Sequence, residues 1–122
     1  MAKSVSRILV LAARQPAFSE LLEEAGYDVD VRTRPLERPD DVDADLAVVF
    51  RGRLIGRTQA ASLHDRGIPV IEVMNVEPPS TSTAGWIRVS NRMTKPDLVQ
   101  LVHAVADWAA APIRTAARSA PA

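Results

Sequence analysis

Cysteine is absent from this chain of 122 residues. Its absence excludes disulfides, a thiol nucleophile and thiolate metal ligands. Histidine occurs only at His64 and His103, which argues against a zinc site built by the protein alone. Aromatic residues make up 4% of the chain, so the core must be built from Val, Leu, Ile and Ala. We expect neither a metal ion nor a cofactor.

Net charge and long apolar runs are also lacking. Fifteen basic side chains balance fifteen acidic ones, so the whole molecule is not drawn electrostatically to nucleic acid or to an anionic membrane. No apolar run approaches the roughly 20 residues of a membrane helix, and the first residues lack the apolar core of a secretory signal. We expect a cytoplasmic protein that binds neither nucleic acid nor membrane. The length suits one domain, which we place at residues 1–111, followed by a disordered tail at 112–122.

Two kinds of apolar pattern predict the strands. Continuous apolar runs, typical of strands buried on both faces, occur at residues 7–13 and 46–50, and residues 68–74 are mostly apolar. Residues 27–33 alternate between apolar and polar side chains, and residues 86–89 form a short final strand; both indicate one wet face. Strands of the second kind belong at sheet edges. The contrast predicts a flavodoxin-like α/β fold, a doubly wound five-stranded parallel sheet in the order 2-1-3-4-5 with helices on both faces.

Three helices are predicted between and after these strands. The first ends at Gly26 and places Ser19 on its wet side. The second spans about 58–66, with Thr58 as its N-cap. The third begins at a pattern that resembles a capping box, with Thr94 as the capping residue. The helices expected after the second and fourth strands are shortened or missing.

Several segments resemble the receiver domain of two-component response regulators. Residues 7–11 resemble the opening strand of that family, Asp45–Val49 its central strand, and residues 68–71 its Pro-Val-Ile strand. Thr94-Lys95-Pro96, ahead of an amphipathic helix, resembles its Lys-Pro signature. The resemblance covers residues 7–111. It implies a signalling domain that acts through protein contacts, at the face made by the fourth strand, the fifth strand and the last helix.

The chain departs from the receiver pattern where a receiver keeps its chemistry. Ala12 and Ala13 replace the acidic pair that would hold magnesium, Phe50 replaces the aspartate that accepts the phosphoryl group, and Met74 replaces the hydroxyl residue. Magnesium needs carboxylate oxygens, and an acyl phosphate needs a carboxylate nucleophile. The resemblance therefore implies a degenerate pseudo-receiver, a non-catalytic module that keeps only Lys95. We expect the Phe50 ring to pack into the space that a metal site would occupy.

An anion site lined by arginine is the alternative. The carboxyl ends of the strands form the functional crevice in such sheets. Those ends carry Arg14, Arg51, Gly52, Arg53 and Lys95, with no acidic residue in the adjacent turns. Arginine suits bidentate binding of phosphate, although surface arginines that pair with nearby aspartates are the plainer interpretation. The two hypotheses are thus a regulatory module with a protein partner, for which a second copy of the chain is an option, and a small protein that binds a phosphate-containing ligand such as a nucleotide.

Three other features receive structural interpretations. His64 is expected to pack on its helix, and His103 and Asp107, one turn apart, are expected to form a solvated pair. Trp108 flanks the apolar stripe of the last helix, where core and exposed contact are equally good interpretations.

Overall fold

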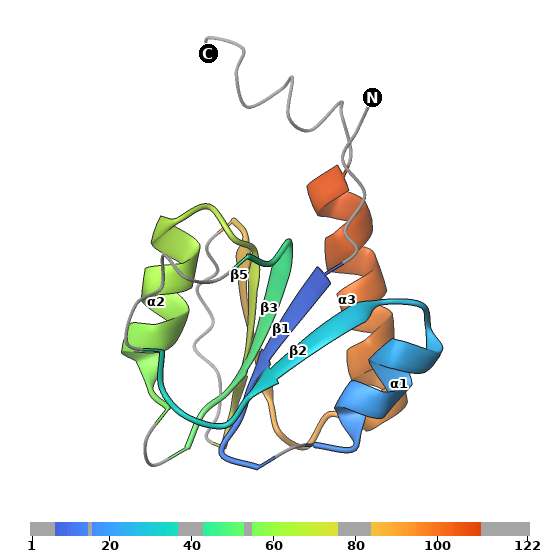
Figure 1. Ribbon diagram of the computed structural model, residues 1–122, viewed down its shortest axis with the longest axis horizontal. Helices are drawn as coiled ribbons and strands as arrows, with labels where there is room; N and C mark the ends of the chain where they lie inside the picture. Colours follow the sequence, from blue (N-terminus) through green and yellow to red (C-terminus); the bar gives the residue numbers. More distant parts are fainter. Residues whose placement is uncertain (1–6, 15, 37–42, 53–54, 76–83, 111–122) are drawn as a thin grey trace, which may run out of the picture.

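A single parallel sheet organises the protein (Figure 1). The computed structural model describes residues 7–14, 16–36, 43–52, 55–75 and 84–110, so the tail predicted at 112–122 lies outside the described residues. The strands are β1 (Arg7–Leu11), β2 (Asp28–Arg32), β3 (Leu46–Phe50), β4 (Val70–Met74) and β5 (Trp86–Ser90), and the helices are α1 (Phe18–Glu24), α2 (Arg57–Asp65) and α3 (Lys95–Ala110). No helix in this part of the chain is long and apolar enough to cross a membrane.

The predicted strand order is confirmed. All four strand pairs are parallel and the order is β2-β1-β3-β4-β5. Among the described residues, no helix lies between β2 and β3 or between β4 and β5, in agreement with the expected reduction of the helix set. The flavodoxin-like α/β fold is therefore present with three helices.

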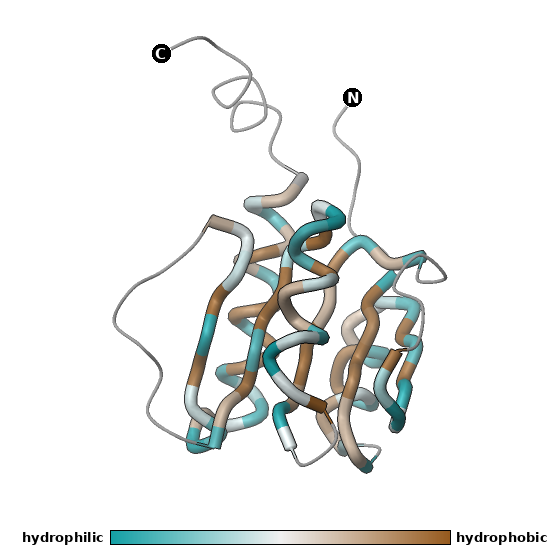
Figure 2. Tube along the Cα trace, turned by 90° about the vertical axis from the view of Figure 1, so that its left-hand side faces the viewer, coloured by the Kyte–Doolittle hydropathy of each residue, from teal (hydrophilic) through white to brown (hydrophobic). Residues whose placement is uncertain are grey.

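The helices cover the two faces of the sheet unequally. Figure 1 shows α1 and α3 on one side of the sheet and α2 on the other. Successive residues of β1 point to opposite faces, so Ile8 and Val10 join the core cluster under α1 and α3, while Leu9 and Leu11 join the cluster under α2. β1 and β3 are therefore apolar on both sides, which explains their continuous apolar runs. Figure 2 shows long brown, hydrophobic stretches in the sheet and a mixture of brown and teal along the helices.

The outer strands are less buried, as their position requires. β2 has exposed ends and a half-buried middle, in which Val29 and Val31 pack against the cluster under α1 and α3. β5 begins with a buried Trp86 and is half-buried thereafter. Each of these strands pairs with only one neighbour among the described strands, so the prediction that they lie at the sheet edges is confirmed.

Two local predictions about helices are wrong. Ser19 was expected on the wet side of α1, yet it is fully buried because its hydroxyl donates to the Pro16 carbonyl oxygen at 2.8 Å, which satisfies the polar group. Thr58 is not an N-cap. The helix already begins at Arg57, and Gly56, with extended backbone and no side-chain cap, occupies the N-cap position.

Other predicted helix ends are confirmed. Thr94 Oγ1 accepts a hydrogen bond from the Asp97 backbone N–H at 3.3 Å, as a capping residue should. Gly26 follows α1 with a φ of 100°, a left-handed conformation that glycine adopts without a steric penalty. These ends fix the directions in which α1 and α3 pack on their shared face.

Candidate functional site

The four residues compared with receiver positions by resemblance lie at one edge of the sheet, because the carboxyl ends of parallel strands meet there. Ala12 is buried directly after β1, and Ala13 beside it is exposed. Phe50 is the last residue of β3, and Met74 is the buried last residue of β4. None of these four side chains carries an oxygen that could ligate magnesium or accept a phosphoryl group.

The Phe50 ring belongs to the core under α1 and α3, although it is half-buried rather than fully buried. It meets the Phe18 ring at the start of α1, with 5.9 Å between ring centroids and an interplanar angle of 65°. This edge-to-face geometry is favourable for aromatic pairs. The position that carries the phosphoacceptor in a receiver therefore serves here to anchor α1 on the sheet.

The described members of the arginine crevice predicted from the sequence follow β1, follow β3 and begin α3. Arg14, after β1, and Lys95, the first residue of α3, are both exposed, and Arg53 lies outside the described residues. A Cβ at Gly52 would meet no atom within 4 Å, and the Gly52 N–H donates to the Ile55 carbonyl oxygen at 2.9 Å. The Arg51 side chain reaches a carboxylate on the neighbouring strand.

That carboxylate belongs to Glu72, a functional candidate that the sequence reasoning missed. Glu72 lies in the middle of β4 with no solvent exposure. Its Oε1 accepts from Trp86 Nε1 at 3.1 Å and lies 3.3 Å from Arg88 Nε, and its Oε2 lies 3.5 Å from Arg51 Nε. Oε2 is buried without a hydrogen-bond partner. The carboxylate is thus stabilised mainly by two guanidinium charges, since a buried charge needs such partners.

The register of the sheet explains how these residues meet. Glu72 pairs with Arg88 across β4 and β5, and both side chains point to the face that α2 covers. The Arg88 guanidinium also lies over the Trp86 ring, 4.4 Å from its centre, within the range of a cation–π contact. The sequence did contain a signal for this ion pair. Glu72 and Arg88 are the single acidic and the single basic residue of β4 and β5, and the predicted order makes these strands neighbours.

An apolar groove runs along the other face of β5, against α3 (the β5–α3 groove). Its volume is about 460 Å³. Half-buried Ile87, Leu101 and Trp108 supply most of its apolar wall. The complete lining is Ala84, Gly85, Ile87, Leu101, Ala104, Val105 and Trp108. Trp108 is half-buried and forms part of this wall. The sequence had allowed two interpretations of this residue, a core position and an exposed contact.

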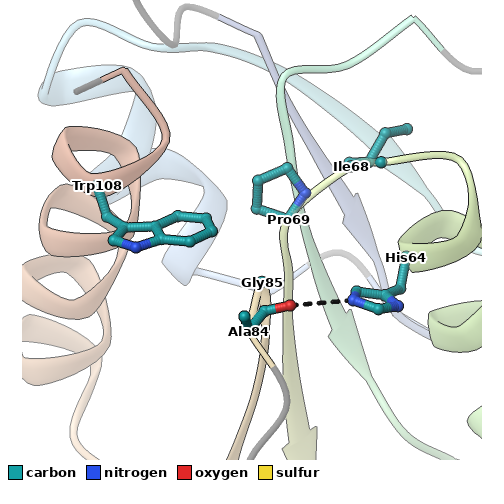
Figure 3. A pocket seen from close by; sticks show the side chains of 7 residues that line it. His64, Ile68, Pro69, Ala84, Gly85 and Trp108 are labelled. Carbon is teal, nitrogen blue, oxygen red and sulfur yellow. Dashed lines mark hydrogen bonds between the residues drawn. The ribbon is translucent and has the colours of Figure 1, made fainter. Parts of the chain in front are cut away.

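A second, smaller pocket of about 80 Å³ adjoins the groove at the start of β5 (Figure 3). Trp108 from α3 and His64 from α2 lie on either side of Gly85, whose φ is 80°. His64 Nε2 donates to the Ala84 carbonyl oxygen at 3.1 Å, and the His64 ring lies 5.4 Å from that of Trp86. These contacts agree with a packing role for His64 and leave little room for a ligand of any size.

His103 and Asp107 do not form the simple solvated pair predicted from their spacing. The Tyr27 hydroxyl lies 2.7 Å from His103 Nδ1, and the two rings pack with centroids 5.5 Å apart. Burial raises the pKa of the Tyr27 phenol above its ordinary value of 10.0, and the negative charge of Asp107 raises it further. This trio ties the start of β2 to α3 at the rim of the sheet.

No family model and no curated protein matches this sequence.

Proposed function

We propose that this chain is a non-catalytic regulatory module that binds a protein partner through the β5–α3 groove. The observation that carries the proposal is the groove, an open apolar hollow beside an edge strand. Contiguous apolar surface on a soluble domain marks contact sites, because leaving it in water is unfavourable. The groove coincides with the face that the resemblance to receiver domains implies for protein contacts.

The shape of the groove favours a helix with an apolar stripe as its occupant. The groove is lined by small residues, Ala84, Gly85 and Ala104, together with the larger Ile87, Leu101 and Trp108. Such an arrangement accepts side chains spaced by one helical turn, as helix-in-groove recognition requires. A helix of another protein and a helix of a second copy of this chain would both satisfy that chemistry.

The degenerate positions support regulation without phosphorylation, as expected of a pseudo-receiver. Ala12, Ala13 and Phe50 supply no carboxylate where the chemistry would need one. Incubation with acetyl phosphate and magnesium should therefore leave the mass of the protein unchanged. An aspartyl phosphate adduct that is labile to base would contradict the proposal.

Site-specific crosslinking tests the groove directly. A photo-crosslinking residue in place of Ala104, which is exposed in the groove, should give one major adduct in cells, whereas the same residue in place of exposed Glu23 on α1 should not. Leu101→Glu should abolish the adduct at 104 while circular dichroism shows an unchanged fold. An adduct of twice the chain mass identifies a second copy, and any other mass identifies a partner. The same adducts at both positions, or an adduct that survives Leu101→Glu, would refute the proposal.

A further inference from the structure

We propose that three arginines on the α2 face form a binding site for a phosphate group carried by a small molecule. Arg51 and Arg88 approach the buried Glu72 carboxylate through Nε, at 3.5 and 3.3 Å. The Cζ atoms of Arg57 and Arg88 lie 5.8 and 4.4 Å from the centre of the Trp86 ring. Three guanidinium groups, from the end of β3, the start of α2 and the middle of β5, thus gather around one Glu72–Trp86 pair.

This arginine cluster (Arg51, Arg57 and Arg88) carries more positive than negative charge. Among the described residues, Glu72 is the one acidic side chain within ion-pair distance of any of the three. Three positive charges against one negative charge leave an excess of two. Like charges at a partly buried surface repel each other because solvent screens them poorly there. A bound anion would relieve that repulsion.

The orientation of the guanidinium groups suits an oxyanion. Glu72 lies 3.5 Å from Arg51 Nε and 3.3 Å from Arg88 Nε, and each guanidinium group carries two further amino groups that can donate to an oxyanion. The Arg51 side chain is 33% exposed and Arg57 is exposed, so solvent reaches both. Glu72 acts as a positioning residue that holds the guanidinium groups of Arg51 and Arg88. A planar guanidinium group can donate two parallel hydrogen bonds to the oxygens of a phosphate group. The site shares only Arg51 with the crevice predicted from the sequence.

The fluorescence of Trp86 can report phosphate binding directly. The chain contains two tryptophans, so replacing Trp108 leaves Trp86 as the one source of tryptophan fluorescence. In a Trp108→Phe variant, Trp86 is the only tryptophan and lies against two of the arginines. We expect phosphate, added at constant ionic strength, to change its fluorescence with a dissociation constant on the order of 1 mM. Arg57→Gln in that background should weaken binding about tenfold, since it removes one charge-assisted contact. Arg14→Gln, an exposed arginine in the other crevice, is the matched control and should leave binding unchanged.

The probes separate the sources of the phosphate group. Inorganic phosphate and a simple phosphate monoester are titrated separately, and tighter binding of either one identifies the form that the site takes. A response that does not saturate, an equal response to chloride, or equal weakening by Arg57→Gln and Arg14→Gln would overturn the proposal. These titrations are independent of the β5–α3 groove, so their failure and the failure of the crosslinking experiment are distinguishable.

Discussion

The two faces of the sheet bury their residues in different ways. The face under α1 and α3 is lined by hydrocarbon from the edge strand β2 to the edge strand β5. The face under α2 is apolar over β1 and β3 but carries Glu72 in β4 and Arg88 in β5. Within β4, Ile71 and Val73 point to the first face while Glu72, between them, points to the second. One strand therefore contributes hydrophobic packing on one side and an ion-pair network on the other.

The comparison shows that complete burial does not imply apolar chemistry. Glu72 is as inaccessible to solvent as its neighbour Ile71. Burial of Ile71 stabilises the fold through the hydrophobic effect. Burial of Glu72 is tolerated because two guanidinium groups and an indole N–H compensate the loss of water. The faces should consequently respond differently to substitution.

Removing the buried carboxylate should have the largest effect. Glu72→Ala leaves Arg51 and Arg88 facing each other without their shared anion, and breaking one partner of a buried pair costs about 3–5 kcal/mol. Urea denaturation gives the change in unfolding free energy, with exposed Glu23→Ala as the control. A loss below about 1 kcal/mol would mean that the network does not stabilise the α2 face.

Truncation of Phe50 tests the opposite face. The fully buried side chain predicted from the sequence would lose about 3–5 kcal/mol in Phe50→Ala, but the ring is half-buried, so we expect about 2 kcal/mol. Phe50→Leu should recover most of this loss, since it fills much of the same volume. If Phe50→Leu is as stable as the wild type, the edge-to-face contact with Phe18 contributes nothing specific.

A smaller loss is expected from the buried hydroxyl of α1. Ser19→Ala removes the hydrogen bond to the Pro16 carbonyl and leaves a methyl group in an apolar setting, at a net cost of about 1 kcal/mol. The same measurement on Ser62→Ala, a half-buried serine on α2, provides the comparison. A stabilised Ser19→Ala protein would show that hydrocarbon alone suffices at this position.

The smallest effect depends on pH and concerns the rim of the α1 and α3 face. The folded protein holds the Tyr27 proton to a higher pH than the unfolded chain does, because the pKa is raised by burial and by Asp107. The resulting stabilisation is complete below pH 10.0 and is lost as the pH rises through the raised pKa. The difference in stability between wild type and Tyr27→Phe should therefore shrink above pH 10.0. A constant difference from pH 8 to pH 11, in denaturant melts, would contradict this assignment.

Sequence patterns were sufficient for the sheet because they report burial directly. Continuous apolar runs marked β1 and β3, a mostly apolar run marked β4, and alternation marked β2, so the strand order followed without any knowledge of contacts. Sequence patterns failed for polar residues whose burial depends on a hydrogen-bond or ion-pair partner elsewhere in the chain. Ser19 is buried because a carbonyl happens to lie within reach, and Glu72 appeared to be an interruption of an apolar strand until the register placed Arg88 opposite it.

The candidate sites were predicted less well, for the same reason. Phe50, Met74 and the two alanines were correctly located at the strand ends because their place follows from topology. The direction of the Arg51 side chain depends on Glu72, which is 21 positions away in the sequence, and Arg57 and Arg88 were not considered because neither follows a strand. Spacing along the chain does not report such contacts.

The place of β1 has a consequence for how the chain assembles. This strand comes first in the described sequence but lies inside the sheet, where Arg7 pairs with Asp28 and Ile8 pairs with Leu46. Neither side of β1 is complete until residues far along the chain have been added, and such distant pairings slow the search for the native state. During synthesis, both edges of the apolar β1 therefore stay unpaired until β2 and β3 have been made. We expect folding in the millisecond to second range typical of sheets built from distant segments, with β1 as the segment most in need of protection before β3 arrives.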